Sequence, residues 1–293
     1  MEVFTFISIL ILTSRCFLSD AHFLSCERKG VYKECRAENS TVLIQAYPDI
    51  KRKKTDLKFF NTGSWICRTP GIITVTADSF SDVQDVRSLH IECVQFRGFP
   101  TPFINQEYLE RIDFLDNHFT EFPREFCANI SSIKSIRVNY QQITKLSATS
   151  FSSIASYLQN LELGHIQLKI IEPNTFSRFR YLKNLRLNGN QLEILRPDMF
   201  DNLSFLETLD LGENVIRTIK PETFSALTRL RALFLQSNHL RNLPQKIFSD
   251  LLNLEMLYLH GNRFIKDPID LVTGLLQLTD YSGVVNKTLN VYQ

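Results

Sequence analysis

The chain has 293 residues, of which 44% are hydrophobic and 22% are charged, and its formal net charge is +2. This composition is typical of a well-packed globular or repeat protein and excludes a chain that is disordered along its whole length. The near-neutral charge gives no basis for a nucleic-acid partner. The aromatic residues are unevenly used, with 23 Phe against 9 Tyr and 1 Trp, which indicates one structural position that repeatedly takes Phe.

Residues 1–21 are predicted to be a secretory signal peptide. The apolar run over residues 3–12 is shorter than the about 20 residues that a membrane span needs. Small residues at Ser19 and Ala21 provide a cleavage site, whereas Glu2 departs from the usual basic start of a signal. We therefore expect a secreted, extracellular protein, with no membrane span or lipid anchor later in this chain.

The cysteines and the glycosylation sequons both agree with an oxidising compartment. Once a signal peptide is removed, the remaining cysteines all lie in the first half of the chain: Cys26, Cys35, Cys67, Cys93 and Cys127. Four of them can form two disulfides and leave one thiol over, in a connectivity that the sequence leaves open. A zinc site is the rival reading, but the chain contains no CxxC pair to support it. Asn-X-Ser/Thr sequons occur at Asn39, Asn129, Asn202 and Asn286.

Residues 22–53 are predicted to form a cysteine-containing cap at the N-terminal end. The basic run at residues 51–54, "KRKK", is interpreted as a solvated turn before the first strand rather than a processing site or an anionic-surface contact. A first strand is expected over residues 56–60, "DLKFF".

From there on, the chain repeats itself. "LRLNGNQLEILRPDMF" (185–200) is followed 24 residues later by "LDLGENVIRTIKPETF" (209–224). Each unit follows the pattern LxxLxLxxNxLxxLxPxxxFxxLxx, with variations. The first Leu of successive units is Leu158, Leu182, Leu206, Leu230 and Leu254. We expect about nine repeats over residues 54–277, followed by a partial repeat or tail over residues 278–293.

The spacing predicts the structure of one unit. Two Leu separated by one variable residue indicate a short half-buried strand, which would pair in parallel with the strand of the next unit. The Asn lies where the chain leaves the strand, and its buried amide must bond to the backbone of its own and the adjacent turn. The Phe is expected to stack over the Phe of the preceding turn on the opposite side. One unit cannot bury these faces alone, so stability comes from stacking.

Three units depart from the pattern, because Val94, Gln141 and Ile166 occupy the Asn position. Gln141 can imitate Asn, whereas Val94 and Ile166 cannot. We therefore expect a local irregularity, or a change of curvature, between residues 141 and 166. At the C-terminal end, either the last fragment covers Leu257 and Leu259 or the chain is a truncated form of a longer protein.

This is the leucine-rich repeat pattern, and its 24-residue form resembles the extracellular type found in Toll-like receptor ectodomains, insect secreted immune proteins and matrix proteoglycans. The resemblance covers about residues 54–286. It implies an α/β fold, a right-handed solenoid or horseshoe with a parallel β-sheet on its concave face. It also implies binding of an extracellular protein ligand or co-receptor through that face, with a glycan or a lipid as alternative ligands. The insect proteins usually add a C-terminal coiled coil, which this chain lacks, and the usual cysteine caps are not matched.

The concave face is predicted from the variable residues that flank the inward Leu of each strand. Its central column is Asp113, Arg137, Glu162, Arg186, Asp210, Phe234 and Tyr258. The first five alternate in sign, which predicts pairing between neighbouring strands or a polar docking strip. Towards the C-terminal end, Ala232, Phe234, Met256 and Tyr258 are expected to form an exposed apolar patch beside His260, unless the C-terminal tail covers it.

Nothing in the sequence indicates catalysis. The chain contains no GxSxG, HExxH, P-loop, GxGxxG or EF-hand motif, and its 6 His are scattered without ligand spacing. We therefore predict no enzyme activity, no cofactor and no metal site. The leading hypothesis is a recognition module in innate immunity or receptor-type signalling. The alternatives are a matrix or adhesion component and an inhibitor of a secreted enzyme.

Overall fold

A computed structural model of the chain describes residues 23–29, 32–37, 40–49, 54–61, 71–74, 86–92, 94–97, 108–124, 130–154, 156–266, 268–282 and 288–289. Side chains are described for 87–92, 108–124, 130–154, 156–266 and 268–282. The chain divides into two compact units, the first over residues 1–119, 123–136 and 153–155 and the second over 120–122, 137–152 and 156–293. Strand β9 (Ser135–Asn139) contributes residues to both.

The first unit begins with antiparallel strands and continues with parallel ones. In sheet order these are β1 (Phe23–Lys29), β2 (Tyr32–Ala37), β3 (Ser40–Asp49), β4 (Lys54–Asn61), β6 (Val86–Glu92) and β8 (Arg111–Leu115). Pairing is antiparallel from β1 to β4 and parallel from β4 to β8. A second, parallel pair is formed by β5 (Gly71–Thr74) and β7 (Val94–Arg97). The strand expected over residues 56–60 therefore exists as β4, and the expected N-terminal cap region contains an antiparallel meander.

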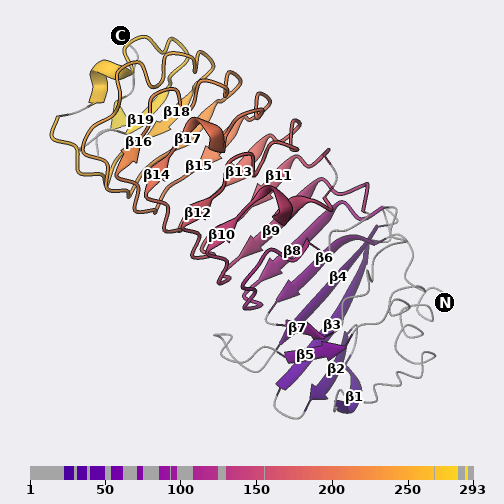
Figure 1. Cartoon of the computed structure of the whole chain (residues 1–293). Helices are drawn as coiled ribbons and strands as arrows, with labels where there is room; N and C mark the ends of the chain where they lie inside the picture. The colour runs from indigo at the N-terminus through magenta and orange to yellow at the C-terminus, as the bar shows by residue number, and fades with distance from the viewer. Residues whose placement is uncertain are drawn as a thin grey trace. The chain divides into compact units, whose positions relative to one another are not determined.

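The second unit is a coil of repeats with one parallel strand per turn. These strands are β11 (Asn160–Glu162), β13 (Asn184–Arg186), β15 (Thr208–Asp210), β17 (Ala232–Phe234), β18 (Met256–Tyr258) and β19 (Asp280–Ser282). They lie side by side in this order (Figure 1), with an offset of 24 residues at each step. A short strand, β20 (Thr288–Leu289), pairs antiparallel with β19. The fragment at 278–286 thus provides a further strand, as its sequence pattern indicated.

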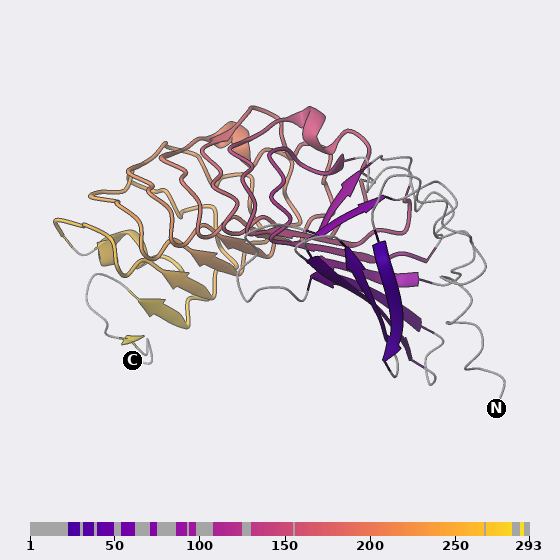
Figure 2. The ribbon, with the colours of Figure 1, turned by 90° about the horizontal axis from the view of Figure 1, so that it is seen from below.

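The side of the coil away from these strands consists mainly of turns (Figure 2). Short parallel pairs join β10 (Lys145–Leu146) to β12 (Ile170–Ile171), and β14 (Ile194–Leu195) to β16 (Thr218–Ile219). Three 3-10 helices are described, η2 (Ala148–Phe151), η3 (Pro197–Met199) and η4 (Pro268–Leu271). In the described residues the helical part of the expected α/β fold is therefore limited to 3-10 turns.

The core of the second unit consists of the repeated Leu positions. Side chains that are 0% exposed fill both inward positions of each strand from β13 to β18: Leu185, Leu187, Leu209, Leu211, Leu233, Leu235, Leu257 and Leu259. Complete burial of a Leu side chain is worth roughly 1.5–3 kcal/mol. At the C-terminal end, Tyr281 pairs with Leu257 and is 1% exposed. The last fragment therefore covers this end of the core.

The Asn residues form the expected ladder of buried amides. Asn214 Nδ2 lies 2.9–3.1 Å from the carbonyl oxygens of Leu187, Leu211 and Gly212, which share its two hydrogens, and its Oδ1 accepts from Leu192 N at 3.1 Å. Asn190, Asn238 and Asn262 repeat this arrangement. Each amide thus links two successive turns, so the ladder joins neighbouring repeats as well as closing each one.

A residue in the left-handed conformation precedes each position of the Asn column from residue 117 to residue 262. The backbone φ is positive at Asp116, Tyr140, His165, Gly189, Glu213, Ser237 and Gly261. Only two of these are Gly, although a non-Gly residue in this region is costly, by about 1 kcal/mol. Where the following residue is Asn, the hydrogen bonds of its side-chain amide offset that cost.

Near residues 141 to 166, where an irregularity was expected, the hydrogen bonds made by side chains differ from those of the later turns. The turn at Ile166 has a second residue with positive φ, Gln167 at 65°, in addition to His165, and the turn at Asn117 shares this feature through Asp116 and His118. Ile166 stands where most other turns have Asn, and its backbone N–H donates to Oδ1 of Asn190 on the next turn at 3.0 Å. The preceding amide, Gln141, donates to Asn139 O at 2.8 Å, and Asn139 Oδ1 accepts from Gly164 N at 2.8 Å. Asn139, on the strand before, thus supplies a link that Ile166 does not.

The Phe positions form a second column inside the coil. Phe200, Phe224 and Phe248 stack with ring centroids 6.3 and 6.4 Å apart. Phe151 makes a tilted contact with Phe176 at 5.8 Å and an edge contact with Phe122 at 4.6 Å. The expected stacking is confirmed for Phe200, Phe224 and Phe248, whereas Phe151 meets its neighbours in tilted and edge contacts.

Candidate functional site

The outward sheet face is the side of the β-strands that points away from the Leu core. The pairing of strands brings the predicted central column together, since Glu162 lies opposite Arg186, Arg186 opposite Asp210, Asp210 opposite Phe234, and Phe234 opposite Tyr258. In the second unit, the residues that were predicted to lie beside one another therefore do so.

Charged side chains on the first strands of this column form ion pairs with one another. Arg137 Nε lies 2.7 Å from Glu162 Oε2, and Arg186 Nη1 lies 3.9 Å from Glu162 Oε1. Asp113, in the first unit, accepts from Arg111 Nε at 3.0 Å on both carboxylate oxygens. The alternation of sign in the sequence thus corresponds to an ion-pair ladder around Glu162.

Asp210 is the last acidic residue of the column. Burial raises the pKa of this carboxyl above its ordinary value of 3.8, while the hydrogen bond from Gly212 N–H and the charge of Arg186 act in the opposite direction. Gly212 N lies 3.0 Å from Asp210 Oδ1. Asp210 is therefore held by its own backbone turn at the point where the column changes from charged to aromatic.

The next two strands replace the charges with aromatic rings. Phe234 and Tyr258 are half-buried and meet edge to face, with ring centroids 5.1 Å apart. Tyr258 also contacts His260, at 5.9 Å between ring centroids. These three side chains form what we call the aromatic cluster. Such edge contacts are worth about 0.5–1.5 kcal/mol beyond the buried area.

Strand β19 supplies polar partners that the sequence did not indicate. Tyr258 Oη donates to Asp280 Oδ2 at 2.5 Å, and this hydrogen bond, followed by burial and the charge of Asp280, raises the pKa of the Tyr258 hydroxyl. His260 Nδ1 lies 2.5 Å from Ser282 Oγ. Asp280 and Ser282 lie in the partial repeat at the end of the chain, which matches the repeat pattern poorly. Only the pairing of β18 with β19 therefore identifies them as neighbours of Tyr258 and His260.

The prediction that Ala232 belongs to an exposed apolar patch is wrong. Ala232 was expected to be exposed, but it is 2% exposed. It lies between Thr208 and Met256 on the adjacent strands, and these larger side chains shield its methyl group. Phe234, Met256 and Tyr258 are half-buried, so these three members of the predicted patch remain partly exposed beside β19.

The remaining predicted sites are placed only in part. Asn202 is exposed, on the turn between Phe200 and Leu203. Cys26 and Cys35 are opposite each other in the antiparallel pair of β1 and β2. The other predicted positions lie outside the described residues: Asn39, Asn129, Asn286, Cys67, Cys93 and Cys127.

Neither a metal centre nor a membrane helix is found in the described part of the chain. Those residues contain no group of three or more His, Cys, Asp or Glu side chains placed to hold a metal ion. They also contain no helix with the length and apolar character that crossing a bilayer requires.

Known proteins resemble the chain in its repeats and its fold. The family model described as "Leucine rich repeat" matches residues 131–192 and 180–240. Among solved structures, one similar structure is titled "Crystal structure of TLR13-ssRNA13 complex", with a TM-score of 0.66 and 24% sequence identity. The alignment covers 72% of this chain and 30% of that one, so this chain spans less than a third of its length. No curated protein matches the sequence significantly. At this identity the likeness concerns the fold.

Proposed function

Because the chain is a leucine-rich repeat protein with repeats of about 24 residues, we propose that it binds an extracellular protein through the outward sheet face. The observation that carries the proposal is the aromatic cluster, where the central column changes from paired charges to the contacting rings of Phe234 and Tyr258. The proposed role is recognition in innate immunity or receptor-type signalling.

The outward sheet face carries paired charges at one end and aromatic side chains at the other, and this difference supports binding at the aromatic cluster. Around Glu162 the charges are already paired, and half-exposed ion pairs of this kind contribute little net binding energy. Aromatic residues and Met are enriched at protein interfaces, and a few such residues usually carry most of the binding energy. Phe234, Met256 and Tyr258 combine these residue types on adjacent strands.

A protein partner suits this face better than a nucleic acid. The solved structure that resembles this fold is titled as a complex with ssRNA13, but that statement concerns TLR13. In the present chain the central column alternates in sign, so it offers no continuous positive strip to neutralise a row of phosphates.

We also propose that the protein is secreted, glycosylated and disulfide-bonded. An exposed Asn202 sequon supports glycan attachment in the second unit. The register of β1 and β2 supports a Cys26–Cys35 disulfide, since residues directly opposite in an antiparallel pair have Cα atoms within bridging range. Non-reducing peptide mapping of the secreted protein would reveal this bridge, and recovery of both cysteines as free thiols would contradict it.

The experiment that tests the binding role uses Phe234→Asp with Ile194→Asp as a matched control. Ile194 is 44% exposed on β14, outside the outward sheet face, so the control adds the same charge at an apolar side chain elsewhere in the unit. Both variants and the unaltered protein are produced by secretion. Partners are then captured from extracellular fluid, and the affinity of the dominant captured protein is measured.

We expect Phe234→Asp to weaken binding by about 30-fold or more, as for an interface residue worth 2 kcal/mol. Ile194→Asp should leave the affinity unchanged, and the melting temperatures of both secreted variants establish that each is folded. Unchanged binding by folded Phe234→Asp would remove the aromatic cluster from the proposal. Retention on collagen-like matrix in place of a soluble partner would favour an adhesive role.

A further inference from the structure

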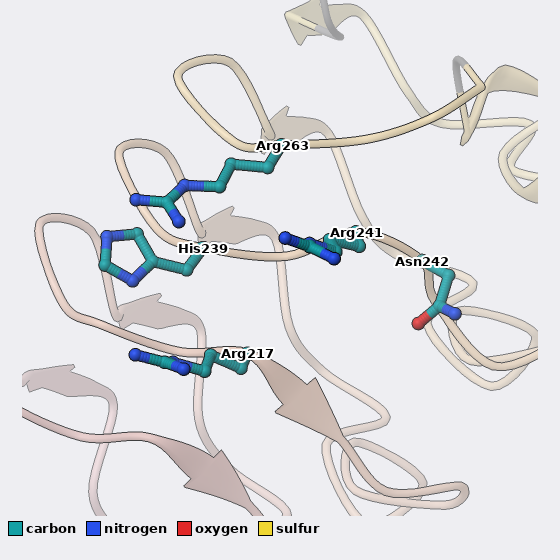
Figure 3. A pocket seen from close by; sticks show the side chains of 5 residues that line it. All are labelled: Arg217, His239, Arg241, Asn242 and Arg263. Carbon is teal, nitrogen blue, oxygen red and sulfur yellow. The ribbon is translucent and has the colours of Figure 1, made fainter.

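A basic hollow lies on the turns that follow three successive strands of the second unit. It has a volume of about 380 Å³ and is lined by Arg217, His239, Arg241, Asn242 and Arg263. Figure 3 shows the imidazole of His239 between the side chains of Arg217 and Arg263, with Arg241 next to Asn242. These residues come after β15, β17 and β18, and none belongs to the aromatic cluster.

The repeat brings these basic side chains together. Arg217 and Arg241 are 24 residues apart, as are His239 and Arg263, so each pair occupies the same position on neighbouring turns. Backbone hydrogen bonds hold the turns in this register, from His239 N to Ile216 O at 2.9 Å and from Arg263 N to Leu240 O at 2.8 Å. The backbone positions of these basic residues are therefore fixed relative to one another.

At two other positions of the same unit, charges on neighbouring turns are opposite in sign and form ion pairs. Lys183 pairs with Glu207 at 3.3 Å, and Arg231 pairs with Glu255 at 2.8 Å. Pairing of this kind avoids the repulsion between like charges on adjacent strands. Beside the hollow, Glu193 pairs with Arg217 at 3.5 Å, but the next turn places Arg241 at this position and so brings a second positive charge next to Arg217.

The polar groups of the hollow are poorly satisfied within the described part of the chain. Arg241 and Arg263 are exposed and have no ion-pair or side-chain hydrogen-bond partner among the described residues, and the Asn242 amide likewise has none. His239 Nδ1 is shielded from solvent without a hydrogen-bond partner. Burial, together with the charges of Arg263 and Arg217, lowers the pKa of His239. An anion in the hollow would supply acceptors for the donors of Arg241, Arg263 and Asn242 and reduce the repulsion among the arginines.

We propose that this hollow binds an oxyanion of the sulfate or phosphate class, carried on a group the size of a sugar ring. Arginine guanidinium groups match the oxygens of such anions in a two-pronged geometry. The hollow opens to solvent, so an anion bound there can be carried on a larger group such as a sugar ring. This site is separate from the aromatic cluster, so it does not depend on the proposed protein partner.

The test is a calorimetric titration of the full chain at low ionic strength with glucose 6-sulfate, glucose 6-phosphate and unmodified glucose. We expect a dissociation constant on the order of 1 mM or tighter for at least one charged sugar, and no binding of glucose. Binding of only one charged sugar would identify sulfate or phosphate as the natural group. Equal binding of glucose, or no binding of either charged sugar, would overturn the proposal.

Three variants test whether the named residues form the site. Arg241→Ala should weaken binding about tenfold, the loss expected for a charge-assisted hydrogen bond. Arg180→Ala, at an exposed arginine outside the hollow, makes the same change in net charge and should leave the affinity within about twofold. Glu193→Gln removes the carboxylate that competes for Arg217 and should tighten binding about two- to threefold.

The variants also separate a specific site from general electrostatic attraction. Equal losses in Arg241→Ala and Arg180→Ala would show that only net charge matters, and the proposal would fail. Weaker binding by Glu193→Gln, in a variant with an unchanged melting temperature, would contradict the role of Arg217. Phe234→Asp should bind the sugar normally, which distinguishes this result from a failure of the proposed protein binding.

Discussion

Replacing Asn214 with alanine should destabilise the second unit by about 3 kcal/mol. The Asn214 side chain is 4% exposed, accepts one backbone hydrogen bond from Leu192, and lies within bonding distance of three carbonyl oxygens. Its amide has two hydrogens, so it can make two full donor bonds at a time, which gives three bonds in all. Each contributes about 1 kcal/mol net. Alanine removes all three and leaves the Leu192 N–H buried without this partner.

The loss should be measured as the free energy of urea-induced unfolding, with a matched variant as control. Asn253→Ala is suitable, because Asn253 is exposed and donates a single bond, to Thr228 O at 2.8 Å. That variant should lose no more than about 1 kcal/mol. Amide exchange at Leu192 adds a local measurement, and its protection should fall in Asn214→Ala while remaining unchanged in Asn253→Ala.

The turn at Ile166 shows that one interruption of the amide ladder is compatible with folding. Asn214→Ala is therefore expected to be folded but less stable. If both alanine variants lost the same free energy and Leu192 kept its protection, the ladder would contribute no more than a surface hydrogen bond. The account of how neighbouring repeats stabilise one another would then have to rest on the Leu and Phe columns alone.

Three further predictions concern single residues of the second unit. Gly189→Ala should cost about 1–3 kcal/mol in urea unfolding, because Gly189 has φ of +65° and an added Cβ would come within 2.2 Å of the His165 ring; a loss below 0.5 kcal/mol would contradict this. Glu162→Gln removes the carboxylate shared by two arginines and should cost less than about 1 kcal/mol, with a difference that shrinks in high salt, whereas a salt-independent loss would refute the ion-pair explanation. The pKa of Asp210 is raised above its ordinary value of 3.8, so the folded protein binds a proton at this carboxyl more tightly than the unfolded chain does. The protonated carboxyl therefore adds to the stability of the fold below the ordinary value of 3.8, and this contribution is lost as the pH rises through the pKa of the folded state. Asp210→Asn should therefore be more stable than the unaltered protein at pH 7, with the advantage disappearing in acid, and an advantage that grew in acid would reverse the sign of this reasoning.

The sequence by itself determined the repeat, because the positions that specify it depend on local spacing. Leu209 and Leu211 alternate with variable residues, Asn214 follows at the end of the strand, and Phe224 closes the turn. Each of these residues recurs 24 positions later with the same neighbours. Burial of the same slots in every turn leaves one arrangement that satisfies the apolar and amide groups together, so strand order, register and the Phe column could be predicted.

Only the tertiary structure decided which variable residues are free to bind. Ala232 appeared exposed in the pattern but is shielded by larger neighbours, while Tyr258 gains a partner from Asp280 in a decayed repeat. Likewise, the left-handed residues before the amide ladder are mostly not Gly, so their sequence gave no signal. The basic hollow depends on side chains from three turns. Exposure and charge at a surface are set by what the neighbouring turns place there, and a residue's own position in the repeat does not contain that information.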